Sequence, residues 1–164
     1  MKVKKTAKLC PNCGEKGRSV TSTTLSSHLT DSAKTGLNST EGFLFCANPA
    51  CDVTYFGPRA FLTSDVRFPV FQKSADPQRL VCYCFNHSVA EIEEEILKTG
   101  TTTVLSSIRD SCKRGLDQCE KNNPQGSCCL GNVTRVIKRF ESPGMATDAE
   151  CDDGSCCKST AKTK

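Results

Sequence analysis

The sequence is poor in the residues that build a large apolar core. It contains no Trp, and aromatic residues make up 6% of its 164 positions. A chain of this length allows one domain or two small ones, and halves of about 80 residues would be marginal on apolar burial alone. We therefore expect the fold to depend on something besides hydrophobic packing.

A long apolar run is also missing. The basic residues 1–8 are not followed by the roughly 7–15 apolar residues of a secretory signal. No later stretch approaches the length of a membrane span. These absences predict a cytoplasmic protein without membrane insertion, in which cysteine side chains stay reduced.

The excess of positive over negative charge is small, and histidine is rare. A net charge of +4 is too small to indicate a nucleic-acid partner. The two histidines are His28, which we expect at the surface of a Ser/Thr-rich stretch, and His87, which we expect at the surface or beside a metal site. No Ser/His/Asp arrangement or pair of acids stands out. We therefore expect no catalytic residues, no enzymatic activity and no small organic substrate.

Cysteine, in contrast, is abundant. The 13 cysteines are about 8% of the chain, which is high enough to indicate a class of protein. Such a count means either disulfides in an oxidising compartment or metal ligands in a reducing one. The missing signal sequence and the odd number of cysteines both favour metal ligation.

Two close cysteine pairs in the N-terminal half have the spacing of a zinc site. The first is a Cys-x2-Cys pair followed by Gly14, and the second is a Cys-x4-Cys pair whose loop contains Asn48 and Pro49. Residues 43–45 and 52–56 alternate as strands do, so the layout is that of a zinc ribbon. Four thiolates without an open position predict a tetrahedral structural zinc ion. The predicted ligands are Cys10, Cys13, Cys46 and Cys51.

An alternative stays open for this zinc site. One of the four cysteines could be a bystander, with His28 or Asp52 in its place.

Further along, residues 66–71 have the composition of a strand, but Pro69 places them at a sheet edge or outside the sheet. The turn at residues 75–78 is a plausible boundary. The expected domains are therefore a zinc-binding β-rich domain over 9–78, a helical domain over 79–141 and a cysteine-containing tail over 142–164.

The second half is predicted to be helical. A capping box formed by Ser88 and Glu91 starts a helix that has an apolar stripe and ends at Gly100. A second helix is expected after the threonines at 101–103, and a third over about residues 130–140. Cys112 falls inside the second helix, where we expect a small buried apolar residue.

Several cysteines lie close to the ends of these predicted helices. A Cys-x-Cys pair precedes the first helix, one cysteine lies in a turn-rich loop, and the adjacent pair Cys128-Cys129 precedes the third helix. Four thiolates can hold a 2Fe–2S cluster, and helix N-termini can stabilise its negative charge. We expect Gly126 and Gly131 to let the backbone approach the sulfurs. The predicted cluster ligands are Cys82, Cys84, Cys119 and either Cys128 or Cys129, of which Cys129 is nearer the helix start. A Rieske-like centre would need two histidine ligands, and the chain has only His28 and His87, so we expect four cysteine ligands instead.

These motifs resemble the N-terminal domain of the CopZ-type copper chaperones. The resemblance is carried by residues 81–88, by the Cys119-Glu120 segment and by residues 123–131, and it covers roughly residues 9–140. In that family a zinc site and a 2Fe–2S cluster share one domain. The resemblance implies that Cys82, Cys84, Cys119 and Cys129 hold the cluster and that the two N-terminal pairs hold zinc.

The implied fold is α+β. A zinc-ribbon-like β half is followed by a small helical half that is similar to bacterioferritin-associated ferredoxin. The family continues into a heavy-metal-associated domain with a Met-x-Cys-x-x-Cys motif, which this sequence does not contain. It has instead a polar tail with Cys151, Cys156 and Cys157, thiols that would suit Cu(I) or another soft ion. The alternative is that these three residues belong to an unstructured remnant.

The expected function is that of an iron–sulfur metallochaperone or redox protein. Electron transfer through a 2Fe–2S cluster would be linked to the handling of copper or another thiophilic metal. The resemblance implies a copper or heavy-metal transport ATPase, or a redox protein, as the partner. The alternative is a ferredoxin-like electron carrier or a regulatory subunit that docks to an oxidoreductase and delivers no metal.

Overall fold

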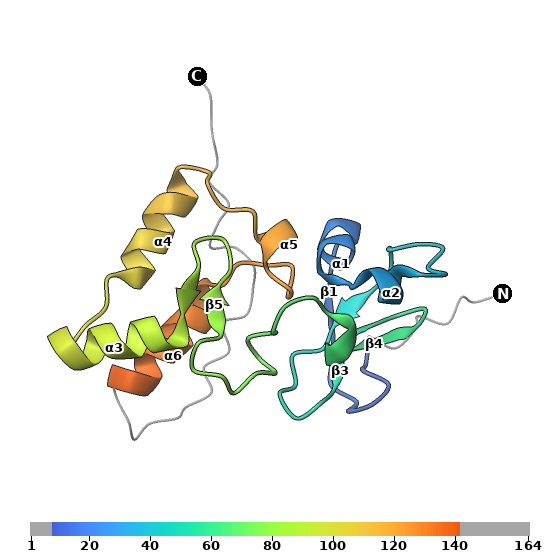
Figure 1. Cartoon of the computed structure of the whole chain (residues 1–164), viewed down its shortest axis with the longest axis horizontal. Coiled ribbons are helices and arrows are strands. Elements are labelled where there is room, and N and C mark those ends of the chain that lie inside the picture. Colours follow the sequence, from blue (N-terminus) through green and yellow to red (C-terminus); the bar gives the residue numbers. More distant parts are fainter. Residues whose placement is uncertain (1–7, 142–164) are drawn as a thin grey trace. The chain divides into compact units, whose positions relative to one another are not determined.

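The computed structural model of the chain describes residues 8–141. The chain divides into unit 1, Met1–Ser74 with Pro124–Gly126, and unit 2, Ala75–Asn123 with Ser127–Lys164. Both units contain helices and strands, so the fold is α+β (Figure 1). Pro124–Gly126 packs with unit 1, although the residues on both sides of it belong to unit 2.

Unit 1 contains a four-stranded antiparallel sheet in the order β1-β2-β3-β4. Its strands are β1 (Arg18–Ser19), β2 (Leu44–Phe45), β3 (Val53–Phe56) and β4 (Ala60–Leu62). All four residues of β3 are buried, because this strand pairs on both sides. The strands predicted from residues 43–45 and 52–56 are thus confirmed as the two central strands of the sheet.

Two short helices and a 3-10 turn complete unit 1. They are α1 (Ser22–His28), α2 (Asp31–Lys34) and η1 (Thr63–Asp65). The helix α1 begins after Thr21, whose hydroxyl accepts a hydrogen bond from the backbone N–H of Thr24 at 3.3 Å. Residues 66–71 lie outside the named strands, as predicted, and Val66 forms an isolated bridge with Leu29.

The prediction that His28 lies at the surface is wrong. Its side chain is only 2% exposed. Thr24, Leu25 and His28 are spaced three and four residues apart on α1, and this spacing places them on one helix face that is buried in unit 1. The sequence of α1 is mostly polar, so it does not indicate that this face packs against the rest of unit 1.

Unit 2 is built from helices and one small hairpin. Its elements are β5 (Leu80–Cys82), β6 (His87–Ser88), α3 (Val89–Thr99), α4 (Val104–Lys113), α5 (Cys119–Asn122) and α6 (Leu130–Glu141). The capping box of Ser88 and Glu91 is present, and Gly100 ends α3 in the left-handed conformation with φ 79°. The predicted start and end of α3 are confirmed.

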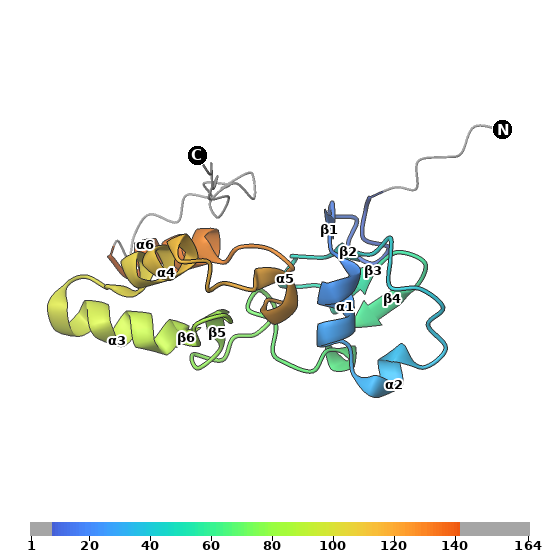
Figure 2. The ribbon, with the colours of Figure 1, turned by 90° about the horizontal axis from the view of Figure 1, so that it is seen from above.

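The core of unit 2 lies between α6 and its two neighbours, α3 and α4. Both neighbours contact α6, and the three helices can be followed in Figures 1 and 2. Each helix contributes an apolar stripe with a period near 3.6 residues, as predicted. The buried residues of these stripes are Val89, Ile92, Ile96, Val104, Ile108, Val133, Val136 and Ile137. Among the helices within residues 8–141, none has the length and apolarity needed to span a bilayer.

Candidate metal centres

Four cysteine side chains meet at one point in unit 1. The Sγ atoms of Cys10 and Cys51 are 3.8 Å apart, and those of Cys13 and Cys46 are 3.6 Å apart. All four sulfurs lie within 4.8 Å of one another. A tetrahedral zinc ion with Zn–S bonds of about 2.3 Å would place neighbouring sulfurs about 3.8 Å apart. The quartet therefore fits one zinc ion, and the four cysteines are the ones that the sequence predicts.

The first cysteine pair lies in a tight turn that is closed by backbone hydrogen bonds. The N–H of Cys10 donates to the carbonyl of Glu15 at 2.7 Å, and the N–H of Gly14 donates to the carbonyl of Cys10 at 2.9 Å. Gly14 has φ +75°, a left-handed conformation that glycine adopts without strain. The Gly that follows the Cys-x2-Cys motif thus turns the chain so that both thiols point to the same side.

The second pair is carried by the β2–β3 hairpin. The N–H of Cys46 donates to the carbonyl of Thr54 at 2.9 Å, and the N–H of Cys51 donates to the carbonyl of Asn48 at 3.2 Å. The Lys73 ammonium donates to the carbonyls of Asn48 and Cys51, both at 2.8 Å. These contacts fix the loop between the two thiols.

Cys51 and Cys46 differ in acidity. Although burial opposes ionisation of Cys51, hydrogen bonds from the Asn12 amide, from the Val53 backbone and from neighbouring thiols lower its pKa to about 7. The Asn12 Nδ2 atom lies 3.3 Å from the Cys51 sulfur. Burial raises the pKa of Cys46 to about 12. Cys51 therefore ionises before Cys46, and zinc binding would release the proton that Cys46 keeps.

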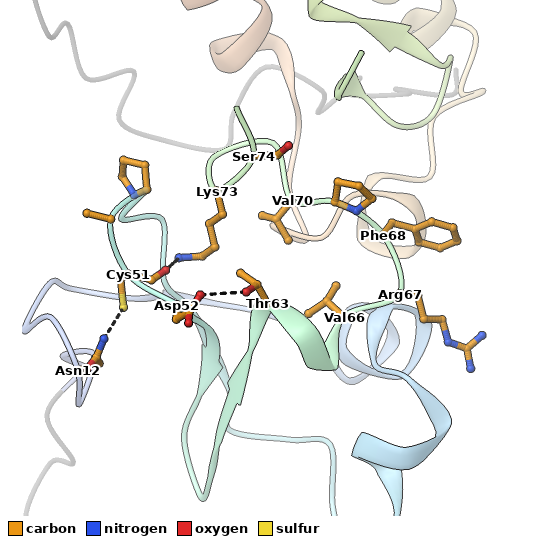
Figure 3. Close-up of a pocket in the computed structure, with 13 residues that line it drawn as sticks. Asn12, Cys51, Asp52, Thr63, Val66, Arg67, Phe68, Val70, Lys73 and Ser74 are labelled. Carbon is orange, nitrogen blue, oxygen red and sulfur yellow. Dashed lines mark hydrogen bonds between the residues drawn. The ribbon is translucent and has the colours of Figure 1, made fainter. Parts of the chain in front are cut away.

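A cavity of about 620 Å³ lies beside the Cys51 loop. Figure 3 shows the Asn12 amide reaching the Cys51 sulfur and the Lys73 ammonium reaching the Cys51 carbonyl. Asp52 also lines this cavity, where its carboxylate accepts a hydrogen bond from the Thr63 hydroxyl at 3.1 Å. Neither Asp52 nor His28 belongs to the sulfur quartet, so the alternative ligands are not needed.

A second group of thiols gathers in unit 2. The Sγ atoms of Cys84 and Cys119 are 3.8 Å apart, a separation at which both sulfurs can bind one metal ion. The thiol of Cys82 shares a hydrogen bond with that of Cys129. These four cysteines come from the end of β5, the turn after it, the first residue of α5 and the residue before α6.

The fifth thiol of this group is Cys128, which is partly buried and shares a hydrogen bond with Cys119. Cys129 is 3% exposed and contacts Cys82. Both members of the adjacent pair therefore contact another thiol, and Cys129 is the more deeply buried of the two. Within residues 8–141, the unit 1 quartet is the only group of three or more Cys, His, Asp or Glu residues whose ligand atoms all lie within 4.8 Å of one another.

Charge is unevenly divided within both pairs of unit 2. The hydrogen bond from Cys129 lowers the pKa of Cys82 despite burial. The hydrogen bond from Cys119, together with the backbone N–H of Gln118 at 3.4 Å, lowers the pKa of Cys84 to about 6. Their partners behave in the opposite way, because the pKa values of Cys119 and Cys129 are both raised, chiefly by Cys128 and Cys82 respectively. Each pair thus holds one thiol that loses its proton more readily than its partner does.

The remaining predicted residues lie apart from these thiol contacts or are placed differently. His87 contacts Glu91, its Nδ1 atom lying 3.1 Å from the carboxylate. Cys112 is partly exposed on α4 rather than buried as predicted. Gly126 approaches Thr24 rather than a sulfur, since a Cβ atom added there would lie 2.8 Å from the Thr24 hydroxyl. Cys151, Cys156 and Cys157 lie outside the described residues.

Comparisons with known proteins agree with this geometry. Residues 7–67 match the family model of the CopZ-type zinc binding domain. The chain is also similar to the crystal structure of the CopZ N-terminal domain of Archaeoglobus fulgidus, with 25% identity, a TM-score of 0.67, and coverage of 78% of this chain and 96% of that one. No curated protein matches the chain. Residues 7–67 are therefore similar to a CopZ-type zinc-binding domain, and the structural similarity extends over more of the chain than either unit alone contains.

Proposed function

We propose that this chain is an iron–sulfur redox protein that takes part in the handling of copper or another thiophilic metal. Unit 1 would be held by its zinc ion, and unit 2 would bind a 2Fe–2S cluster. One observation carries the proposal: four thiols from β5, the turn after it, α5 and the start of α6 form two contacting pairs. Two pairs are what two iron ions with two cysteine ligands each require.

The spread of the thiols in unit 2 argues against a second mononuclear site. A single tetrahedral ion needs four ligand atoms that all lie close together, as in the unit 1 quartet. The pairs Cys84–Cys119 and Cys82–Cys129 would each bind one iron of a binuclear cluster. Cys128 would stay beside Cys119 as a thiol that does not bind iron.

The surroundings of the thiols suit a negatively charged cluster. The backbone N–H of Gln118 points to the sulfur of Cys84, and Cys129 immediately precedes the N-terminus of α6. Donors and helix dipoles directed at thiolates offset the cost of buried negative charge and raise the reduction potential. A 2Fe–2S cluster supplies one-electron transfer, and the partly exposed pair Cys84 and Cys119 would be the point nearest solvent for that exchange.

The metal-handling part of the proposal is supported by the similarity to CopZ and by the thiols of the tail. Cys151, Cys156 and Cys157 would bind a soft ion such as Cu(I). The partner would be a copper or heavy-metal transport ATPase, or a redox protein, in the cytoplasm. The chain would act as a carrier rather than as an enzyme.

A reductive titration of the anaerobically purified chain tests the cluster. We expect a coloured protein whose visible absorption falls on addition of one electron per chain, with an electron paramagnetic resonance signal from the reduced form. A colourless protein after reconstitution with iron and sulfide would contradict the proposal.

A second candidate function is that of a ferredoxin-like carrier without metal delivery. It is favoured by one observation, namely that all the proposed cluster ligands lie within residues 8–141, apart from the tail. Titration of the wild-type chain and of the triple variant C151S/C156S/C157S with Cu(I) separates the two candidates. Metal handling by the tail predicts that the triple variant binds less Cu(I), whereas equal stoichiometry and affinity would support the carrier.

A further inference from the structure

The chain segment between Cys119 and Cys129 leaves unit 2 in its middle. Asn123 and Ser127 belong to unit 2, whereas Pro124–Gly126 belongs to unit 1. The thiols proposed to bind the cluster therefore stand on both sides of a three-residue segment that packs with the zinc-binding unit. The contacts of that segment decide how firmly it is held.

Tyr55 makes the main polar contact with this segment. Its hydroxyl donates to the carbonyl of Pro124 at 2.6 Å, and its side chain is 0% exposed. Next to it, the Gln72 amide donates to the side-chain oxygen of Gln125 at 2.6 Å. A buried hydrogen bond without competing water fixes a backbone carbonyl in one place, and its loss leaves a buried acceptor unsatisfied.

Gly126 is held by shape as well. It has φ +70°, and a Cβ atom there would lie 2.8 Å from Thr24 Oγ1 and 3.3 Å from a methyl group of Val20. Only glycine combines this backbone conformation with so close an approach to α1. The segment therefore fits against unit 1 through both hydrogen bonding and contact.

The two ends of the segment are fixed to the thiol-bearing chain. The Asn123 amide donates to the carbonyl of Ser127 at 2.9 Å, which closes a turn around Pro124–Gly126. The backbone N–H of Asn123 donates to the carbonyl of Cys119 at 3.0 Å. A displacement of the turn would thus be passed along the chain to Cys119 on one side and to Cys128 and Cys129 on the other.

Tyr55 also stands close in the chain to the zinc ligands. It lies on β3, four residues after Cys51, and pairs in register with Phe45, the residue before Cys46. The hairpin that carries the second cysteine pair of the zinc site therefore also places the tyrosine hydroxyl.

We propose that Tyr55 is a positioning residue for the cluster thiols, acting through its hydrogen bond to Pro124. The inference rests on the proposed function, because it assigns to unit 1 a part in holding the cluster ligands of unit 2. It gives the zinc site a second role, since the ordered β2–β3 hairpin fixes the turn that joins Cys119 to Cys129.

The substitution Tyr55→Phe tests this role in the full-length, cluster-loaded chain. We expect iron release to a chelator to become about tenfold faster, as expected when a buried carbonyl loses its donor. The visible circular dichroism of the cluster should also change, because the ligands are held less uniformly. Zinc content should stay at the wild-type value, since no zinc ligand is altered.

Phe61→Leu is the matched control, because Phe61 is fully buried in the same core and its ring lies against Phe43 and Arg59. This variant should lower the free energy of unfolding of unit 1 without changing the cluster spectrum. An independent variant, Gly126→Ala, should accelerate iron release as Tyr55→Phe does. Adding Thr24→Ala should recover part of that loss, because it removes the atoms that the new Cβ would meet.

The outcomes separate this inference from the proposed function. A wild-type chain that takes up no iron overturns both. If the cluster-loaded wild-type chain and Tyr55→Phe release iron at the same rate and have the same spectrum, the positioning role alone is overturned. The same holds if Phe61→Leu reproduces every effect of Tyr55→Phe. If Tyr55→Phe does not fold, Gly126→Ala and its double variant with Thr24→Ala decide in the same way.

Discussion

In unit 1 the four thiols lie within 4.8 Å of one another, whereas the five thiols of unit 2 form one contacting pair, Cys82–Cys129, and a second, Cys84–Cys119, with Cys128 beside Cys119. The same residue type is therefore arranged in two different ways. Four sulfurs around one point suit one ion, and two separate pairs suit two ions joined by bridging sulfide. The spacing of the sulfurs, rather than their number, indicates how many metal ions a cysteine site holds.

The two sites also differ in what holds the sulfurs. In unit 1 the thiols lie in turns beside short strands, and backbone hydrogen bonds fix both turns. In unit 2 two thiols lie at the end of β5 and in the turn after it, and the others lie at the starts of α5 and α6. A site of the first kind depends on local turn geometry, whereas a site of the second kind depends on how the helices pack. Substitutions in the two units should therefore have separable effects.

The largest effect is expected for Cys46→Ser. Cys46 is 1% exposed and lies within the quartet, so its loss should abolish stoichiometric zinc binding and lower the free energy of unfolding by several kcal/mol. Zinc analysis and thermal unfolding measure both. Cys112→Ser, a partly exposed cysteine of α4, is the matched control and should keep zinc. A Cys46→Ser chain with one tightly bound zinc would contradict the assignment of the quartet.

Cys84→Ser should break the other site alone. Cys84 contacts Cys119 at 3.8 Å and holds the thiolate of that pair, so its loss should reduce iron and visible absorption to a small fraction of wild type. Zinc should remain at one per chain, because the quartet is intact. Equal loss of zinc and iron would show that the two sites are not separable in the way their geometry suggests.

A smaller effect is expected for Asn12→Ala. Its amide donates to the Cys51 sulfur, and loss of such an outer hydrogen bond commonly weakens metal binding by about 10–100-fold. Competition with a zinc chelator measures the affinity. Asn38→Ala, at an exposed position of the same unit, should bind zinc as wild type does. An unchanged affinity in Asn12→Ala would mean that this hydrogen bond does not tune the site.

The smallest effect is expected for Ser88→Ala. The hydroxyl accepts from the backbone N–H of Glu91 at 3.1 Å, and loss of an N-cap costs about 1 kcal/mol. The effect should appear in the thermal unfolding of unit 2, with metal content unchanged. Ser107→Ala, an exposed change within α4, should be nearly neutral. A loss of iron in Ser88→Ala would show that the cluster site depends on the start of α3.

Much of this architecture could be predicted where local sequence determines structure. The Cys-x2-Cys-Gly turn, the capping box at Ser88 and the apolar stripes of α3, α4 and α6 all depend on residues a few positions apart. The helix α1 could not be predicted in this way, because Leu25 is its only large apolar residue. Its burial depends on packing within unit 1, and this is also why the position of His28 was predicted wrongly.

Contacts between distant residues were the other limit of prediction. Tyr55 and Pro124 are 69 positions apart, and no periodicity or motif pairs them. Gly126 was expected to approach a sulfur because it lies close to the cysteines in the chain, yet it lies against Thr24. Similarly, the cysteine spacing indicated which thiols could gather in unit 2, but their division into pairs required the folded structure.

Metal and sulfide analysis of the anaerobically purified, full-length chain tests the contrast between the two sites most directly. The spacing of the thiols predicts one zinc, two iron and two acid-labile sulfide ions per chain. A chain that after reconstitution holds zinc but neither iron nor sulfide would contradict the assignment of unit 2. A second zinc ion in place of iron would contradict it in the same way.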